Sequence, residues 1–600
     1  MIHGVIGAVS SALLVSQFVI LDGFVRGRSW LAEPRVFFDV ATSVALLFVL
    51  LLAATSPLRR ALFALSASTL LVLQVLVFRY YHVALDIQVV ASALFAKRDV
   101  RFVLLRAAPA FAMSVALVAL AQWSLLTVAH RALRAASPMR QSSTGAVLVI
   151  ASLGGLFGMG PRRATPEIRA AQALGALHSR HETSVASAIA LPPLHAERTE
   201  VPSILFVLTE SVRAADYRGG GERPTAPETA ALTRGRTDLA QMRAVSSYTA
   251  LSLSAILTGR SQEGPRDEIL RSPSLFDFAR AARDAHGGRP LVAYFSAHSA
   301  TIFETDAVRG AVDHFVSIET IRGHDVEDDD DYGDLPLDRD IVDRFAKELP
   351  GLPAASVIML QLANTHAPYF LDPARAPFEP YDHVVTWSGM PKLLNAYRDS
   401  IYEQDRTLAR AVRSFIEHAG TRPWLVVFTS DHGEAFGEHG AIHHGQNLMD
   451  EQVHVPAWIA SGNGALTSAQ ERALADDAGR FVTHLDLLPT LLDAMGLWDN
   501  FSVAPHRAVM PGQSLLRAHE SRPPIPVTNC TGMFPCPLNT WGLYADDRKL
   551  VSRAWDGGWS CLALGGIEER VVEGADPACA GLRVSSRRTF PLLPNGAPNR

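Results

Sequence analysis

An apolar run, Trp424-Leu-Val-Val-Phe-Thr-Ser430, leads directly into Asp431-His-Gly-Glu-Ala-Phe-Gly-Glu-His-Gly-Ala-Ile-His-His-Gly445. The run has the length and composition of a buried β-strand. The segment after it places the following ligand-type side chains within 14 residues: Asp431, His432, Glu434, Glu438, His439, His443 and His444. So many polar groups are unsuited to an apolar core, and the intervening glycines allow the backbone to turn tightly around an ion. The pattern predicts a metal-binding loop at the end of a buried strand.

Two further apolar runs, at Ser203–Glu210 and Ala355–Leu362, also have the character of buried strands. Stretches with helical periodicity alternate with these runs, at Ser274–Ala285, Leu337–Lys347, Leu394–His418 and Asp486–Met495. Alternation of helices with nearly continuous apolar strands is typical of an α/β domain. The sequence therefore predicts an α/β domain with a mostly parallel central sheet.

Two of the expected strands end in an acid, Glu210 and Asp431, and His432 follows the second acid at once. Ligands of open parallel sheets bind beyond the carboxyl ends of the strands. A single acid at such a position is more often a cap or an ion-pair partner. Carboxylate and imidazole together suit a borderline divalent ion such as zinc or manganese.

The charge of the chain is unevenly distributed. Residues 1–160 contain 13 Lys and Arg but only 5 Asp and Glu, whereas the remaining residues contain 42 and 55. The second part is therefore acidic, which argues against a nucleic-acid-binding protein, because such proteins are usually basic. No nucleic-acid partner is expected.

The basic part contains apolar runs at about 4–22, 36–55, 61–79, 103–129 and 145–160. A membrane-spanning helix needs about 20 apolar residues. A secretory signal peptide would account for the first run but not for the other four. We therefore expect a transmembrane domain of about five spans over residues 1–160, followed by a linker with one helix over residues 161–200.

All four cysteines, Cys530, Cys536, Cys561 and Cys579, lie in the expected C-terminal extension, residues 521–600. Two disulfides would suit an oxidising compartment, with the pairing left open. Four free thiols and a small metal-binding knot are the alternatives. The spacing is not Cys-x-x-Cys, which disfavours the metal.

Four segments carry a resemblance to a known group of proteins. Ser430–Gly445 is similar to the metal loop of the alkaline-phosphatase-like superfamily, which includes sulfatases, phosphoethanolamine transferases and lipoteichoic acid synthases. Ile204–Ser211, Asn364–Tyr369 and Phe481–Leu492 resemble its first strand, its His-x-Pro-Tyr segment and its late helix entry. The resemblance covers about residues 201–500, in the superfamily's order. It implies a sulfatase-type catalytic domain over residues 201–520.

Thr249-Ala-Leu-Ser252 resembles the Thr-Ala-x-Ser segment of phosphoethanolamine transferases, in which the threonine is the nucleophile. Sulfatases use a formylglycine made from cysteine, and this chain has no cysteine before Cys530. A dication would make the threonine alkoxide accessible at neutral pH. Ser252 is the alternative nucleophile, and a capping role at a helix start is the alternative for Thr249.

The resemblance also implies the ligands of the ion and the residues beside the substrate. Glu210, Thr249, Asp431 and His432 are expected to bind one divalent ion, with zinc favoured and manganese as the alternative. His366 and His444 are expected to hold a second ion or to protonate the leaving oxygen. His443 is the alternative to its neighbour, and a structural role is expected for His439 and His454.

The expected function is transfer of a phosphoethanolamine-like headgroup from a phospholipid donor to an envelope glycan or lipid, through a phosphothreonine intermediate. The alternatives are a membrane-tethered sulfuric or phosphoric ester hydrolase that uses the same site, and a non-catalytic binding protein. Counting arginines and lysines does not fix the orientation. From the cysteines and the resemblance, we expect a multi-pass protein of the cell inner membrane with a periplasmic catalytic domain.

Overall fold

The computed structural model describes residues 56–81, 99–134, 191–261, 269, 271–298, 310–323, 334–529, 541–545, 547–552, 559–565, 569–572 and 576–589. The chain divides into two compact units, one with the helices α3 and α5 and the other with the sheets and helices after residue 191. The expected spans at 4–22, 36–55 and 145–160 lie outside the described residues. So does the expected linker helix.

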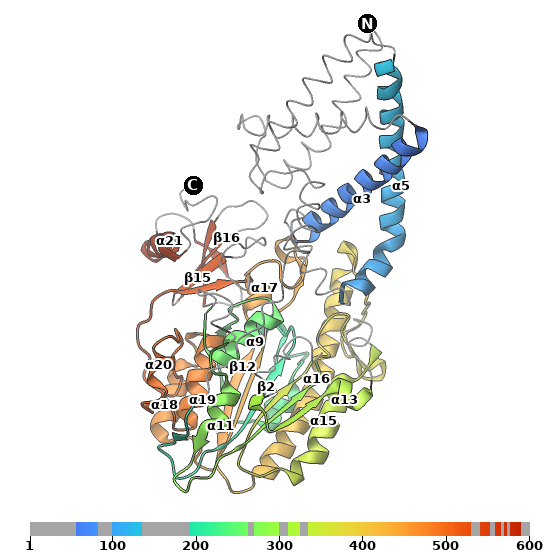
Figure 1. Cartoon of the computed structure of the whole chain (residues 1–600). Helices are drawn as coiled ribbons and strands as arrows, with labels where there is room; N and C mark the ends of the chain where they lie inside the picture. Colours follow the sequence, from blue (N-terminus) through green and yellow to red (C-terminus); the bar gives the residue numbers. More distant parts are fainter. Residues whose placement is uncertain are drawn as a thin grey trace. The chain divides into compact units, whose positions relative to one another are not determined.

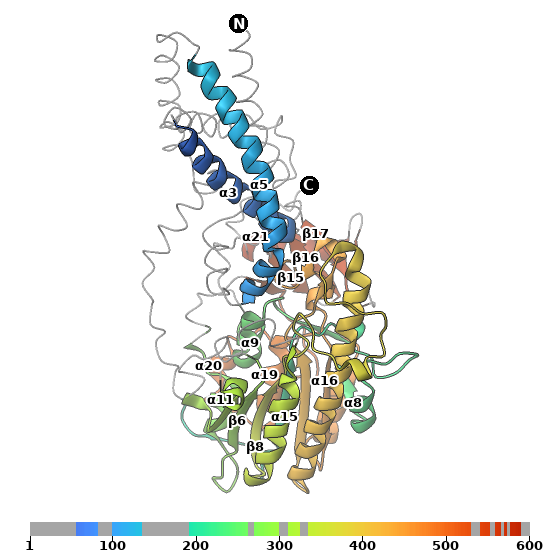
Figure 2. The ribbon, with the colours of Figure 1, turned by 90° about the vertical axis from the view of Figure 1, so that its right-hand side faces the viewer.

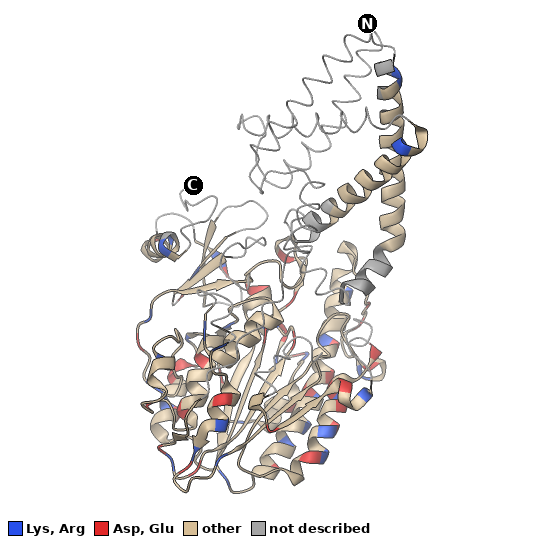
Figure 3. Cartoon of the chain, in the orientation of Figure 1, with Lys and Arg blue, Asp and Glu red and all other residues tan. Residues whose placement is uncertain are grey.

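The first unit contains α3 (Pro57–Tyr81) and α5 (Asp99–Arg134), at the places of two expected spans. The parts of both helices that are coloured by charge in Figure 3 carry few charged side chains. The Ser68 hydroxyl donates to Gln122 Oε1 at 3.1 Å, which joins the two helices through a buried hydrogen bond. Within the described residues, one stretch, Ala108–Val128, is long and apolar enough to cross a membrane.

The second unit is built around a seven-stranded sheet of order β3-β12-β9-β2-β8-β6-β7. Its strands are β2 (Ser203–Thr209), β3 (Thr237–Asp238), β6 (Leu291–Ser296), β7 (His314–Ser317), β8 (Ser356–Gln361), β9 (Trp424–Ser430) and β12 (Ala457–Gly462). The five strands from β9 to β7 are parallel. At one edge, β12 is antiparallel to β9, and β3 is antiparallel to β12. The expectation of a mostly parallel sheet in an α/β domain is confirmed.

Helices cover both faces of this sheet (Figures 1 and 2). Because β2 and β8 are buried along their whole length, both faces must meet apolar partners. On one face, α15 (Leu337–Glu348) and α16 (Met390–Ala419) pack Phe345 and Phe415 into a core with Val207 and Leu360. The other face carries α9 (Thr249–Thr258), α11 (Leu275–Ala281) and α19 (Leu487–Ala494).

The expected strands and helices lie close to the observed ones, with differences at their ends. The helix expected at Ser274–Ala285 ends earlier, because Ala282–Arg283 is the short strand β5, which pairs with β1 (Leu194–His195). The helix expected at Leu394–His418 begins earlier, at Met390, because a proline at its second position suits a helix start. The strand β6 was not expected from the sequence.

The C-terminal extension contains a second, five-stranded antiparallel sheet of order β14-β15-β16-β17-β18. Its strands are β14 (Ile525–Thr528), β15 (Trp541–Ala545), β16 (Arg548–Ser552), β17 (Trp559–Ala563) and β18 (Arg570–Val571), and α21 (Pro577–Thr589) follows them. A disulfide joins Cys561 to Cys579, which connects β17 to α21. Cys530 and Cys536 lie outside the described residues.

Candidate active site

The site is centred on two acids that follow neighbouring parallel strands. Thr209 of β2 pairs with Ser430 of β9, so the next residues, Glu210 and Asp431, leave the sheet side by side. Both side chains are almost completely buried. The sequence-based expectation placed these acids at one edge of the sheet, and the structure brings them together there.

The two carboxylate oxygens of Asp431 differ in their hydrogen bonds. Its Oδ1 accepts from the backbone N–H groups of Ser211 at 2.9 Å and His432 at 2.7 Å. Its Oδ2 is buried and, among the described residues, receives no hydrogen bond. A buried oxygen of this kind needs a partner, because an unsatisfied polar group is costly.

His432 presents a ring nitrogen to both acids. Its Nδ1 donates to the Gly433 carbonyl at 2.9 Å, which leaves Nε2 directed into the site. That Nε2 lies 3.3 Å from Glu210 Oε1 and 3.4 Å from Asp431 Oδ2. Gly433 allows this path of the chain, because a Cβ there would lie 2.4 Å from the Glu451 carbonyl oxygen.

Thr249 meets the same group of atoms. Its hydroxyl Oγ1 lies 3.1 Å from His432 Nε2 and 3.3 Å from Glu210 Oε1. It is the first residue of α9, where the helix dipole favours negative charge. The hydroxyl of Ser252, the alternative nucleophile, donates instead to the Ser246 carbonyl at 3.0 Å.

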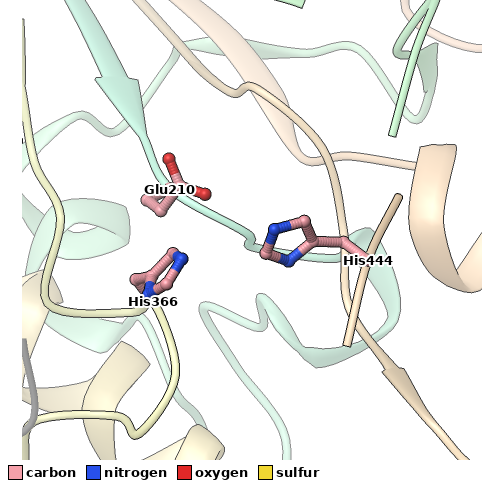
Figure 4. Close-up of side chains that lie close together, drawn as sticks. All are labelled: Glu210, His366 and His444. Carbon is pink, nitrogen blue, oxygen red and sulfur yellow. The ribbon is translucent and has the colours of Figure 1, made fainter. Parts of the chain in front are cut away.

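Two expected histidines, His366 and His444, also lie beside Glu210. His366 and His444 turn their rings toward this carboxylate (Figure 4), and each residue of the trio offers one ligand atom within 4.8 Å of the others. The rings of His444 and His432 are 4.3 Å apart between centroids. The expected residues Glu210, Thr249, Asp431, His432, His366 and His444 thus form one continuous cluster.

A buried carboxylate, Glu434, orients the histidines of the metal loop. Nδ1 of His443 lies 2.9 Å from its Oε1, and Nδ1 of His444 lies 3.1 Å from its Oε2. The Tyr369 hydroxyl donates to Oε1 at 3.2 Å. A donor at Nδ1 leaves Nε2 of each ring available as a ligand or proton carrier.

His298 was not expected and also reaches the site. It is buried two residues after the end of β6, and its Nε2 lies 3.5 Å from Glu210 Oε2. Its ring meets that of His366 edge to face, with 6.2 Å between centroids. The apolar run Leu291–Ser296 followed by a histidine was the available signal for this position.

Three other histidines, His443, His439 and His454, contact residues outside the trio of Glu210, His366 and His444. His443 approaches Glu434 and the Tyr369 hydroxyl. His439 is exposed, and its Nδ1 lies 3.0 Å from Glu451 Oε1. His454 Nε2 lies 2.9 Å from the Ala240 carbonyl oxygen.

The charges in the cluster are strongly coupled. Burial favours the neutral form of Glu210, but the hydrogen bond and charge of His432 hold the pKa of Glu210 well below its usual range. Burial and the neighbouring Glu210 raise the pKa of Asp431 well above its usual range. Burial lowers the pKa of His366 to about 4. A dication between the two acids would favour the ionised form of both.

The donor set therefore fits a divalent metal ion. Glu210, Asp431 and His432 offer ligand atoms that lie within 4.8 Å of one another, and the Thr249 oxygen adjoins them. An ion at this place would also give Asp431 Oδ2 the partner that it needs. Mixed oxygen and imidazole donors suit zinc, and manganese accepts the same set.

Comparison with known families identifies the larger part of the second unit. The model of the family described as Sulfatase matches residues 202–497. These residues form a sulfatase-family domain. All the residues of the cluster lie inside this sulfatase-family domain, and its fold is alkaline-phosphatase-like, as the sequence resemblance implied.

Two similar proteins extend the comparison. An uncharacterized sulfatase, YidJ of Escherichia coli strain K12, is 31% identical over 118 residues, which are 20% of each chain. Phosphatidylethanolamine transferase Mcr-1 of Escherichia coli is 27% identical over 146 residues, which are 23% of this chain and 26% of that protein. The alignments thus span about a fifth to a quarter of these relatives.

A solved structure with the same fold covers more of the chain. It is the integral membrane protein lipooligosaccharide phosphoethanolamine transferase A from Neisseria meningitidis, with 16% identity and a TM-score of 0.56. The match covers 83% of this chain and 96% of that one.

Proposed function

We propose that the protein is a membrane-anchored, metal-dependent transferase. It moves a phosphoethanolamine-like headgroup from a phospholipid to a hydroxyl or phosphate of an envelope glycan or lipid. The observation that carries this proposal is the position of the Thr249 hydroxyl, 3.1 Å from His432 Nε2 and 3.3 Å from Glu210 Oε1. The similarity to two phosphatidylethanolamine transferases, Mcr-1 and Mcr-2 of Escherichia coli, supports the substrate class.

The ion would be held by Glu210, Thr249, Asp431 and His432, with zinc favoured and manganese as the alternative. Bound there, it supplies positive charge that lowers the pKa of the Thr249 hydroxyl and stabilises phosphoryl oxygens. A second ion, if bound, would be held by Glu210, His366 and His444, whose ligand atoms lie within 4.8 Å of one another.

In the first step Thr249 Oγ1 attacks the donor phosphorus. A bond between Oγ1 and phosphorus forms, and the bond from phosphorus to the lipid alcohol oxygen breaks. The Thr249 hydroxyl gives up one proton and the lipid alcohol leaves with one, so the protons balance, and the headgroup remains on Thr249 as a phosphothreonine ester. His366, His444 and His298 lie around Glu210, where they can hold phosphoryl oxygens and deliver that proton.

In the second step an acceptor oxygen attacks the same phosphorus from the opposite side. The bond to Oγ1 breaks, the acceptor gives up a proton, and the Thr249 hydroxyl is regenerated. Water as the acceptor would make the same site a hydrolase of phosphoric or sulfuric esters. The two functions therefore differ only in what enters at this step.

The membrane part of the proposal rests on the first unit. Ala108–Val128 is long and apolar enough to cross a membrane, and the match to an integral membrane transferase extends over 83% of the chain. We propose about five spans, a location in the cell inner membrane and a periplasmic catalytic domain. A lipid-anchored donor would then meet the site at the membrane surface.

The test uses the full-length protein in detergent with phosphatidylethanolamine labelled in its headgroup and an envelope extract. We expect label on the peptide that contains Thr249 when donor alone is present, and label in the extract's glycan or lipid when acceptor is added. A Thr249→Ala protein should bind metal and transfer nothing. Label found only in soluble headgroup would refute the transferase. Label on Ser252 would refute the assigned nucleophile.

A further inference from the structure

The backbone that leads into Thr249 is a buried, irregular segment. Residues 244–248 connect β4 (Gln241–Arg243) to α9, and the first four of them are fully buried. No side chain caps the start of α9. The position of the Thr249 hydroxyl therefore depends on what holds this segment in place.

Asn529, far along the chain, makes three hydrogen bonds to the segment. Its Oδ1 accepts from the Ser246 hydroxyl at 2.9 Å and from the Ser247 backbone N–H at 2.8 Å. Its Nδ2 donates to the Ser247 hydroxyl at 2.7 Å. One carboxamide thus satisfies two adjacent residues just before the proposed nucleophile.

The contact extends to the segment that follows the metal loop. The Ser247 hydroxyl, which receives the Asn529 bond, donates onward to the Asn447 carbonyl at 2.7 Å. The Ser246 hydroxyl in turn accepts from the Tyr248 N–H at 3.2 Å. Asn529 therefore connects the approach to Thr249 with the chain directly after the histidines of the metal loop.

The C-terminal sheet holds Asn529 firmly against the sulfatase-family domain. Asn529 directly follows β14. In the neighbouring strands, the Tyr544 hydroxyl donates to the Ala244 carbonyl at 3.3 Å, and Lys549 Nζ donates to the Leu448 carbonyl at 2.9 Å. Lys549 also pairs with Asp450 at 2.8 Å in a fully buried ion pair.

We infer that Asn529 is a positioning residue for the nucleophile, supplied by the C-terminal sheet from outside the residues that match the family model. The inference rests on the proposed role of Thr249. The three hydrogen bonds of Asn529 described above go to Ser246 and Ser247, so it acts on Thr249 through residues 246–248. A small displacement of a reacting oxygen can lower a rate by about 100-fold, which sets the size of the expected effect.

The experiment compares Asn529→Ala with Ser552→Ala in the full-length protein. Ser552 lies in the same sheet, and its hydroxyl accepts from the Trp541 N–H rather than from the segment before Thr249. With labelled phosphatidylethanolamine, Asn529→Ala should slow labelling of Thr249 by about 10- to 100-fold in a single turnover. The donor concentration for half-maximal rate and the bound metal should remain unchanged. Ser552→Ala should label at the wild-type rate.

A double-mutant cycle tests the route of the effect. If Asn529 acts through Ser247, Asn529→Ala and Ser247→Ala together should slow labelling little more than either change alone. If the two substitutions together slow labelling by the product of their separate factors, the inference is overturned. So would equal losses in Asn529→Ala and Ser552→Ala, or loss of metal from Asn529→Ala.

Amide hydrogen exchange separates this inference from the proposed function, because it needs no donor. Asn529→Ala should speed exchange in residues 244–248 by about 10-fold or more, since the Ser247 N–H loses its acceptor, and Ser552→Ala should not. Unchanged exchange would refute the positioning role. Failure of the wild-type protein to label Thr249, with the exchange difference present, would refute the proposed reaction and keep Asn529 as the residue that orders the segment.

Discussion

Two buried clusters of charged side chains lie in the second unit, and they are completed in different ways. In one cluster, Asp450 pairs with Arg243 at 2.9 Å and with Lys549 at 2.8 Å, and Glu569 also pairs with Lys549. In the other, Glu210 and Asp431 face histidines and Thr249, with no arginine or lysine among their contacts in the described residues. Among the described residues, each cluster has one carboxylate oxygen without a hydrogen bond, but Glu569 Oε2 of the first lies against Lys549, whereas Asp431 Oδ2 of the second has no lysine or arginine beside it.

This difference distinguishes a cluster of charges that stabilises the fold from a cluster that can bind a cation. Buried acids matched by fixed cations hold two parts of a fold together, and the Coulomb attraction is already satisfied. Buried acids matched by histidines gain from an added cation. The same residue type, aspartate, should therefore respond differently to the same substitution in the two clusters.

The largest effect is expected for Asp431→Asn. The amide cannot supply the anionic oxygen that Oδ2 offers, so bound metal and activity should fall together, with turnover reduced by about 1,000-fold or more. The fold should persist, since burial and Glu210 already raise the pKa of Asp431 and disfavour its charge. Elemental analysis, donor labelling and a melting curve of one preparation provide the measurement. Unchanged metal content would show that the ligand set is wrong.

The matched substitution, Asp450→Asn, should act on stability instead. It leaves the charges of Arg243 and Lys549 buried with fewer partners, and breaking a buried ion pair costs about 3 kcal/mol or more. Urea unfolding followed by fluorescence should show this loss, while the folded protein keeps its metal. A stable variant that has lost metal would erase the distinction between the clusters.

A change at the border of the site, Glu434→Gln, should have an intermediate effect. The amide replaces a carboxylate that accepts from His443 and His444, so the rings lose orientation and basicity. Residues that orient ligands in this way typically contribute about 10- to 100-fold. The rate of Thr249 labelling should fall by a factor in that range. The ion held by Glu210, Asp431 and His432 should be retained. Glu438→Gln, which alters a carboxylate paired with Arg213, is the control.

The smallest effect concerns pH and a buried acid away from both clusters. Burial raises the pKa of Asp338 to about 6, although it accepts hydrogen bonds from Ala363, Asn364 and Gln404. Because the pKa of Asp338 is higher in the folded than in the unfolded state, this carboxyl stabilises the fold when it is protonated. The stabilisation is complete below about pH 4 and is lost as the pH rises through 6. Between pH 4 and pH 7, the free energy of unfolding of the wild-type protein should fall by about 2 kcal/mol more than that of Asp338→Asn. Parallel urea titrations of both proteins across that range measure it, and superimposable curves would contradict it.

The centre of the candidate site could be foreseen because it depends on local patterns. Glu210 and Asp431 follow apolar runs that have the length and composition of buried strands, and parallel strands bring their carboxyl ends to one edge. Thr249, His366 and His444 came from resemblance to a family rather than from the pattern itself. The structure places all of them around Glu210 and His432.

The rest depends on contacts between distant segments, which a single sequence does not reveal. His298 is in the site only because β6 pairs with β8, and that strand was not expected. Asn529 reaches residues 246 and 247 because an antiparallel sheet packs there, although the extension was expected only to contain cysteines. The membrane spans before residue 56 and after residue 134 remain predictions.

Complete burial of Glu210, Asp431 and His432 has a consequence for how the protein acquires an ion. With the ligand atoms shielded from solvent, an ion enters or leaves only when the surrounding loops open, so exchange is slow compared with binding at an open surface. Chelators would then remove the ion from the folded protein more slowly than from an open surface site. The ion found after purification would reflect the compartment in which the chain folded more than the buffer in which it was stored.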